Sequence, residues 1–251
     1  MKFLLISTIA ILNCLAFSLG QKNATTCHTT SWWVLLPMKK VYLDNYLKAS
    51  NIPLTYNTSQ LPFSSELKPD EHVVIISLTF VEFKVQIPYL VRKDKNVMFK
   101  PLIYESNFID TSATKLVYGL PAYTADMAYD GSGGSYNISF SNGKLLATFK
   151  PLTSNFSIYG SPETKNFSSF VDSNSFPWLC NPPLSTSNPK CATDTYTFSQ
   201  TKVRPVSMVL LVENGILNAI PDGKYTNDGD RLLGAWQLDT TLIITSPYTC
   251  P

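Results

Sequence analysis

Short runs rich in β-branched and aromatic residues recur along this chain, and turn-forming sequences separate them. The runs cover residues 73–83, 97–104, 135–140, 144–149, 156–159, 193–201, 206–212 and 242–245. Such runs between turn signals predict strands, and Asn142-Gly143, which joins two of them, predicts a hairpin. The sequence therefore predicts a mainly β fold with few helices, of the barrel or sandwich type. One amphipathic helix is expected over residues 39–48.

Charged residues are sparse in this chain. Only 15% of the 251 residues are charged, against about 25% in a typical soluble domain. Lys and Arg number 20 and Asp and Glu number 18, so no basic excess is present to neutralise phosphates, and nucleic acid is not an expected partner. The hydrophobic content of 44% suffices for a core, and no repeat or linker divides the chain. Residues 21–251 are therefore expected to form a single domain.

The first twenty residues have the features of a secretory signal peptide. One lysine precedes an apolar run over residues 3–17, and Ser18 and Gly20 supply the small residues of a cleavage site. A membrane anchor is the weaker interpretation, because Asn13 interrupts the run and a span needs about 20 apolar residues. We expect residues 1–20 to be removed and the mature protein to be secreted to the extracellular space, with no membrane anchor.

The cysteine count favours disulfides. Five cysteines become four if Cys14 leaves with the signal peptide, and an even number in an exported chain indicates two disulfides, with three pairings available. We favour Cys180 with Cys191, across a short loop, and Cys27 with Cys250, near the two chain ends. Free buried thiols are the alternative.

Five Asn-x-Ser/Thr sequons lack proline at the middle position, and together they predict an N-glycoprotein. They are Asn23, Asn57, Asn137, Asn155 and Asn166. Glycans at these positions would supply the solubility that the sparse charges do not.

Motifs for metal, cofactor or nucleophilic chemistry are missing from the sequence. Neither His28 nor His72 lies in an H-E-x-x-H pattern, and G-x-S-x-G and C-x-x-C do not occur. The glycine cluster at residues 131–134 lacks phosphate-loop spacing, and Asn227-Asp-Gly-Asp230 lacks the distal glutamate of a calcium loop. We expect solvated turns at both segments, and no metal, cofactor or catalytic residue.

One stretch of the chain, residues 97–123, carries a family resemblance. Its segments are Val97-Met-Phe-Lys-Pro-Leu-Ile-Tyr104, Glu105-Ser-Asn-Phe-Ile-Asp110 and Lys115-Leu-Val-Tyr-Gly-Leu-Pro-Ala-Tyr123. They resemble acetoacetate decarboxylase and its relatives, in which a Tyr-acidic turn is followed by an Arg-Glu step and a Gly/Ala-aromatic-Pro-Lys-Lys segment. The resemblance implies the family's closed or cone-shaped antiparallel β-barrel, and looser matches extend it over about residues 35–215.

The residues on which the family's chemistry depends are replaced in this sequence. The resemblance places Ala122 and Tyr123 where the family has its two lysines. Leu116 takes the place of the glutamate in the Arg-Glu step, and Val91, two residues after Tyr89, that of the pocket glutamate. Schiff-base catalysis needs a neutral lysine amine, which an apolar pocket and a cationic neighbour provide. The resemblance therefore implies that decarboxylation has been lost.

Other lysines are the candidates to replace the lost amine. They are Lys39, Lys40, Lys84, Lys93, Lys95 and Lys100. Each stands in a polar or turn context that fits a solvated charge, so we expect none of them to act as a nucleophile.

The replaced residues leave two alternatives for the interior, an open apolar pocket that suits a small ligand or a core filled by side chains. The candidate ligand-binding residues are Tyr89, Val91, Leu116, Tyr118, Ala122 and Tyr123. We expect a secreted, glycosylated, non-catalytic protein that binds a small apolar molecule. One alternative is an enzyme of the same superfamily with changed carbonyl chemistry, in which Tyr118 or Tyr123 acts as a general acid. The other is a structural or extracellular-matrix glycoprotein.

Overall fold

The structure, a computed structural model, describes residues 24–130, 134–140, 143–164, 167–168, 170, 176–183, 189–215, 217, 220–227 and 234–250. Its strands are β1 (Ala24–Lys39), β2 (Thr55–Tyr56), β3 (Glu71–Leu78), β4 (Glu82–Arg92), β5 (Lys95–Glu105), β6 (Ala122–Thr124), β7 (Asp126–Asp130), β8 (Ser135–Phe140), β9 (Gly143–Pro151), β10 (Ser157–Ile158), β11 (Trp178–Cys180), β12 (Lys190–Ala192), β13 (Asp194–Tyr196), β14 (Lys202–Glu213), β15 (Gly223–Thr226), β16 (Gly234–Thr245) and β17 (Tyr248–Thr249). The helices with described bounds are α2 (Lys40–Ala49), α3 (Phe108–Ala113), a π-helix (Thr114–Tyr118) and 3-10 turns at Ser64–Glu66, Pro162–Thr164 and Phe198–Gln200.

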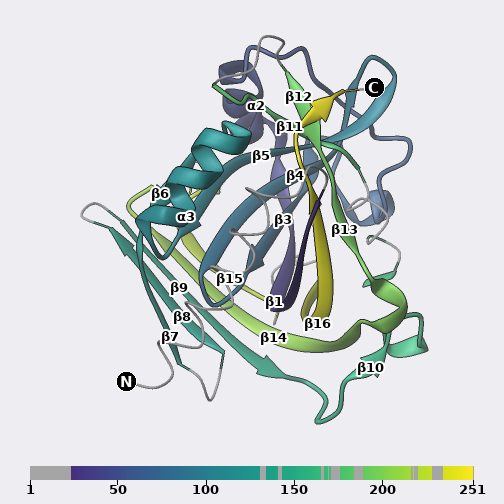
Figure 1. Ribbon diagram of the computed structural model, residues 1–251. Coiled ribbons are helices and arrows are strands. Elements are labelled where there is room, and N and C mark those ends of the chain that lie inside the picture. Colours follow the sequence, from purple (N-terminus) through teal and green to yellow (C-terminus); the bar gives the residue numbers. More distant parts are fainter. Residues whose placement is uncertain are drawn as a thin grey trace.

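Strand β1 lies at the centre of the sheet because it pairs with both β3 and β16. On one side the order runs through β3, β4 and β5 to β6, and β5 also pairs with β11. On the other side β16 pairs with β14, which leads through β9 and β8 to β7. Figure 1 shows β7, β8 and β9 side by side, with α2 and α3 at the opposite end of the molecule from β10.

The two ends of this ladder, β6 and β7, are consecutive in the chain, and only Ala125 separates them. Because consecutive Cα atoms lie about 3.8 Å apart, the sheet curves round until its edge strands meet at this residue. The pairings among the described strands do not close the ladder there. The mainly β prediction is confirmed, whereas the predicted closed barrel is not confirmed.

Trp32 and Trp33 are neighbours on β1 and point to opposite faces of the sheet, since strand side chains alternate. Each belongs to a separate apolar core. The core that we call the Trp32 cluster includes Trp32, Leu43, Leu47, Val85, Leu102, Phe149 and Met208. The other, the Trp33 cluster, includes Trp33, Ile75, Ile103, Ala122, Phe167, Phe170, Trp178 and Trp236. The sheet is thus covered by apolar side chains on both faces, in line with the high hydrophobic content.

Helix α2 confirms the helix predicted over residues 39–48. Leu43 and Leu47, one turn apart, are buried in the Trp32 cluster, and the helix contacts β1. Val41, which the sequence placed on the same face, is exposed instead.

The strand predicted over residues 73–83 is divided in the structure between β3 and β4. Thr79 ends β3, because its hydroxyl oxygen accepts hydrogen bonds from the backbone N–H groups of Val81 and Glu82, at 3.4 and 3.0 Å. The predicted hairpin at Asn142-Gly143 is confirmed in its strands, β8 and β9, which pair in antiparallel register.

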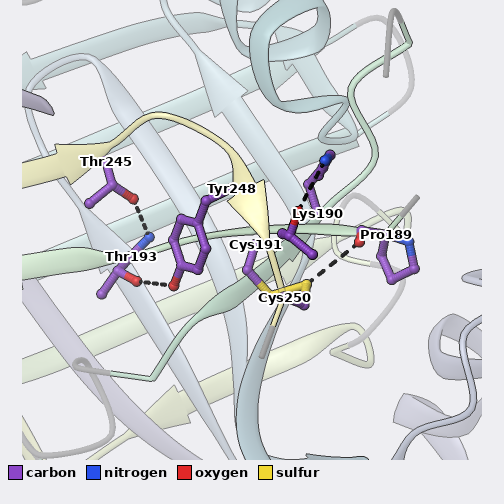
Figure 2. Close-up of a disulfide and its surroundings, with 8 residues drawn as sticks. Pro189, Lys190, Cys191, Thr193, Thr245, Tyr248 and Cys250 are labelled. Carbon is purple, nitrogen blue, oxygen red and sulfur yellow. Dashed lines mark hydrogen bonds between the residues drawn. A yellow bond between two sulfur atoms is a disulfide. The ribbon is translucent and has the colours of Figure 1, made fainter. Parts of the chain in front are cut away.

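The structure contradicts the predicted disulfide pairing. Cys191 is bonded to Cys250 (Figure 2), and therefore neither Cys180–Cys191 nor Cys27–Cys250 is formed. The register explains the difference: β12 places Cys191 opposite Leu179 on β11, so Cys180 points to the other face of the sheet. Cys180 is a free, buried thiol.

Strand β17 is held beside β12 by more than the disulfide. The hydroxyl groups of Thr193 and Tyr248 are hydrogen-bonded at 2.7 Å, and the backbone N–H of Thr193 donates to the hydroxyl of Thr245 at 2.8 Å (Figure 2). These contacts fix the last described residues against the sheet.

Several predictions fall on residues outside the described part. They concern the signal peptide at residues 1–20 and the sequons Asn23 and Asn166. Among the described helices, none has the length and apolar character required to span a membrane.

Candidate ligand-binding site

Strand β6 places Ala122 and Tyr123 on opposite faces of the sheet. It runs parallel to β5, with Ala122 beside Ile103 and Tyr123 beside Tyr104. Ala122 is fully buried in the Trp33 cluster, whereas Tyr123 is 50% exposed. The position that the sequence resemblance assigned to the family's first lysine therefore lies within packed core, and the next position reaches the surface.

The other four predicted residues do not gather around Ala122. Tyr89 is buried edge-on against Phe176, with ring centroids 5.0 Å apart. Tyr118 packs on Trp178 at 5.0 Å. Leu116 is 62% exposed, and Val91 lines a cavity that Tyr123 does not line. The structure thus brings none of these four together with Tyr123 in one cavity.

Tyr123 lines a half-open cavity of about 320 Å³, which we call the Tyr123 cavity. Its walls come from the end of α2 and the residues after it, from β5, from the loop before β6 and from β11. The lining residues are Tyr46, Ser50, Ile52, Phe99, Pro101, Gly119, Leu120, Pro121, Tyr123, Leu179, Cys180 and Asn181. Apolar walls with a few hydroxyl and amide groups and a volume in this range are typical of small-molecule sites.

Gly119 fixes one wall of the Tyr123 cavity. It has a left-handed φ of 64°, and a Cβ atom at this position would overlap the carbonyl oxygen of Asn181. The backbone N–H of Asn181 donates to the carbonyl of Tyr118 at 2.9 Å, which joins the two walls. Only glycine permits this approach of the two backbones.

A second cavity, of about 410 Å³, lies next to the first and shares Ile52 with it. We call it the Arg92 cavity. Its lining residues are Asn51, Ile52, Pro53, Leu54, Thr55, Val91, Arg92, Lys93, Asp94 and Pro189. It therefore differs from the Tyr123 cavity in carrying charged side chains.

Two lysines that the sequence assigned to solvent are buried, and that prediction is wrong for them. Lys84 is 6% exposed and Lys100 is 3% exposed. The ammonium group of Lys100 donates to Asp194 at 2.7 Å and lies 3.9 Å from the centre of the Trp178 ring. The indole N–H of Trp178 donates to the second oxygen of Asp194 at 2.9 Å.

These lysines lie on the same face of the sheet as Ala122. Lys84 pairs with Ile103, and Ile103 pairs with Ala122, so the three residues form one row across β4, β5 and β6. Burial lowers the pKa of Lys100 to about 8, and the nearby charge of Lys84 adds to the decrease, while Asp194 opposes it. Two buried amines, those of Lys84 and Lys100, thus lie on strands of the same sheet as Ala122.

Acidic groups complete this buried charged cluster. Glu82 forms an ion pair with Lys84 at 2.8 Å and lies opposite Glu105 in the register of β4 and β5. Burial raises the pKa of Glu105 to about 7, and the Glu82 carboxylate adds to the increase. Among the described residues, no group of side chains suited to a metal ion is found.

The sequence carries only a partial signal for the two buried lysines. Lys84 stands between Phe83 and Val85, and Lys100 between Phe99 and Pro101. Because strand side chains alternate between the two faces of a sheet, a single lysine in an apolar strand run points to one face. In this protein apolar side chains cover both faces, so the lysine is buried whichever face it points to. The burial of these lysines depends on the second layer, which no local pattern revealed.

Comparison with known proteins shows the fold. No protein-family model matches the chain, and no curated protein matches it. A solved structure of acetoacetate decarboxylase is similar with a TM-score of 0.55 at 11% identity, over 90% of this chain and 88% of that chain. Acetoacetate decarboxylase from Legionella pneumophila gives a TM-score of 0.52 at 12% identity, over 89% and 85% of the two chains.

A third similar structure is the enduracididine biosynthesis enzyme MppR, complexed with the condensation product of pyruvate and imidazole 4-carboxaldehyde. It gives a TM-score of 0.52 at 10% identity, over 89% of this chain and 87% of that chain. At such identities the likeness concerns the fold alone. The chain has the acetoacetate decarboxylase-like fold, as the resemblance over residues 97–123 implied.

Proposed function

We propose that this protein is a secreted N-glycoprotein that binds a small, largely apolar molecule in the Tyr123 cavity and does not decarboxylate acetoacetate. The observation that carries the proposal is the cavity itself, with Phe99, Leu120 and Leu179 in its walls and Tyr123 at its side. Uncharged walls with hydroxyl groups favour an apolar ligand with one polar group.

The packing around Ala122 supports the loss of the family's reaction. Ala122 has no exposed surface and belongs to the same apolar core as Phe167 and Trp178. A Schiff base at this position would require both an amine and room for a substrate. The side chain supplies no amine, and Ala122 lines neither the Tyr123 cavity nor the Arg92 cavity.

The proposal of secretion rests on the sequence alone. The proposal of glycosylation rests on the sequons and on the exposure of two of them. Asn137 on β8 and Asn155 after β9 are both exposed. The side-chain amide of Asn57, by contrast, donates to Asn96 at 2.8 Å and to Gln60 at 3.2 Å. We expect glycans at Asn137 and Asn155 in protein from the native host, which glycopeptide mass spectrometry checks.

A cavity-filling variant tests the ligand-binding proposal. Leu179→Trp should abolish the uptake of an apolar fluorescent probe, because the indole would occupy the Tyr123 cavity. Ile158→Trp adds the same side chain at a position that is 70% exposed on β10 and should bind the probe like the wild type. A wild-type protein that binds no apolar probe would refute the proposal.

A second candidate function, carbonyl chemistry at Lys100, is favoured by the lowered pKa of that amine beside Lys84. In this reaction the neutral amine attacks a carbonyl carbon, the carbinolamine loses water, and an imine forms. The carboxylate of Asp194, hydrogen-bonded to the amine at 2.7 Å, would position that amine, and the proton that the ammonium group releases would pass to solvent.

Reduction of the imine tests this second candidate. Protein incubated with pyruvate or acetoacetate and borohydride should gain a reduced adduct on Lys100 by peptide mass spectrometry. The adduct should be lost in Lys100→Met and kept in Lys202→Met, which replaces an exposed lysine. An unmodified Lys100 in the wild type would exclude the candidate.

A further inference from the structure

We propose that the ligand is an anionic amphiphile, a carboxylic acid with a hydrocarbon body. Its body would lie in the Tyr123 cavity and its carboxylate in the Arg92 cavity. This inference rests on the proposed function, since it assigns the class of molecule that occupies the same site. It is carried by two adjoining cavities of different character.

Ile52 is the residue at which the two cavities meet. It follows the end of α2 and lines both cavities. Ser50 lines the Tyr123 cavity, and Asn51 lines the Arg92 cavity. The hydroxyl of Ser50 accepts from the backbone N–H of Ile52 at 3.2 Å, which holds this turn in place. A chain-like molecule that crosses Ile52 would therefore occupy both cavities.

The Tyr123 cavity suits a hydrocarbon body. None of its lining residues in the described part of the chain is Asp, Glu, Lys, Arg or His. Burial raises the pKa of Cys180 to about 12, so this thiol is neutral as well. A carboxylate in the Tyr123 cavity would lose its hydration without gaining a cation, which is costly.

The Arg92 cavity supplies the charge that a carboxylate needs. Arg92 and Lys93 line it together with one acid, Asp94. Within the described residues, neither cation takes part in an ion pair. An arginine binds a carboxylate through two parallel N–H donors, and the nearby ammonium group adds attraction.

The backbone holds these two cations in a defined place. Lys93 and Asp94 are the central residues of the turn between β4 and β5, both with left-handed φ values, of 48° and 62°. Arg92 pairs with Lys95 across that hairpin. At the positive end of the site, Arg92 therefore lies on a paired strand and Lys93 in the two-residue turn that follows it.

A matched pair of ligands tests the inference. We expect dodecanoate to bind about three- to tenfold more tightly than dodecanol at low ionic strength, because two partly exposed ion pairs contribute about that much. The Arg92→Gln/Lys93→Gln variant should bring dodecanoate to the affinity of dodecanol and leave the affinity for dodecanol unchanged. A Lys150→Gln/Lys202→Gln variant removes two exposed cations elsewhere and should keep the difference.

The outcomes separate this inference from the proposed function. Equal binding of dodecanoate and dodecanol by the wild type would overturn the anionic ligand and leave an apolar site standing. Binding of dodecanoate that Leu179→Trp does not weaken would also overturn it, because the body would then lie elsewhere. If neither compound binds, the inference and the proposed function both fail.

Discussion

Gly119 joins two walls of the Tyr123 cavity, and its replacement should be more harmful than that of an ordinary turn glycine. Gly119→Ala would meet the backbone of Asn181, in addition to the cost of about 1–2 kcal/mol for a left-handed alanine. Gly160→Ala, also at a left-handed φ but with open space around it, carries only the conformational cost. In urea denaturation, the free energy of unfolding of Gly119→Ala should be well below that of Gly160→Ala. Equal decreases in the two variants would contradict the backbone overlap at Gly119.

Lys100 and Asp194 should be strongly coupled in stability. Lys100→Met leaves the Asp194 carboxylate buried with only the Trp178 indole as donor, which should cost about 3–5 kcal/mol. In the Lys100→Met/Asp194→Asn double variant no charge is left unpaired, so its free energy of unfolding should exceed that of Lys100→Met. A double-mutant cycle measures this coupling, and additive single effects would show that the ion pair is not formed.

At the residue scale, the burial of individual side chains was the feature that the sequence predicted least well. The resemblance predicted both Ala122 and Tyr123 as ligand-binding residues, and the strand period explains why Ala122 is buried while Tyr123 lines a cavity. The burial of Lys84 and Lys100 was missed because it depends on Asp194 and Trp178, which are far away in the chain. Long-range pairing of this kind leaves no mark in the local pattern.

At the scale of elements, the Cys191–Cys250 disulfide adds a covalent bond to the pairing of β17 with β12. The Cys191–Cys250 disulfide spans 59 residues, for which the chain-entropy relation gives about 4 kcal/mol. Cys191→Ser/Cys250→Ser should lower the free energy of unfolding by up to about that amount, measured under non-reducing conditions. Disulfide mapping should recover a peptide that links residues 191 and 250, and a link between Cys180 and Cys191 would contradict the register of β11 and β12.

Elements with short-range pairing were predictable, and those with long-range pairing were not. The α2 helix and the β8–β9 hairpin follow from local periodicity and a turn dipeptide. Strand β1 was not predicted, although its four Thr residues and the apolar run Trp32-Trp-Val-Leu-Leu36 are typical of a strand. Its strand conformation depends on β16, from which it is separated by most of the chain.

At the scale of the whole molecule, two buried groups set opposite pH dependences. Burial lowers the pKa of His72 to about 4 from its ordinary value of 6.5. The unfolded chain therefore binds more protons between these values, and stability falls by up to about 3 kcal/mol as pH decreases through this window. His72→Gln should abolish this part of the acid sensitivity in denaturation curves between pH 4 and 6.5.

Glu105 gives stability the opposite pH dependence to His72. Its pKa is raised to about 7 from 4.5, so the folded state holds its proton more tightly. Stability should therefore fall as pH increases from 4.5 to 7, again by up to about 3 kcal/mol. In Glu105→Gln, whose amide oxygen still accepts from Thr114, stability should no longer fall across this range. An unchanged slope would show that Glu105 titrates as an ordinary carboxyl group.

The position of β1 between β3 and β16 also affects the order in which the sheet can form. Ala24 is opposite Thr245 in the register of β1 and β16. The pairing of β1 with β16, its longest, can therefore form only after almost the whole chain has been synthesised. Contacts between such distant residues slow folding. During synthesis, the backbone N–H and C=O groups on one edge of β1 stay unpaired until β16 has been made, and an unpaired strand edge of this kind promotes aggregation.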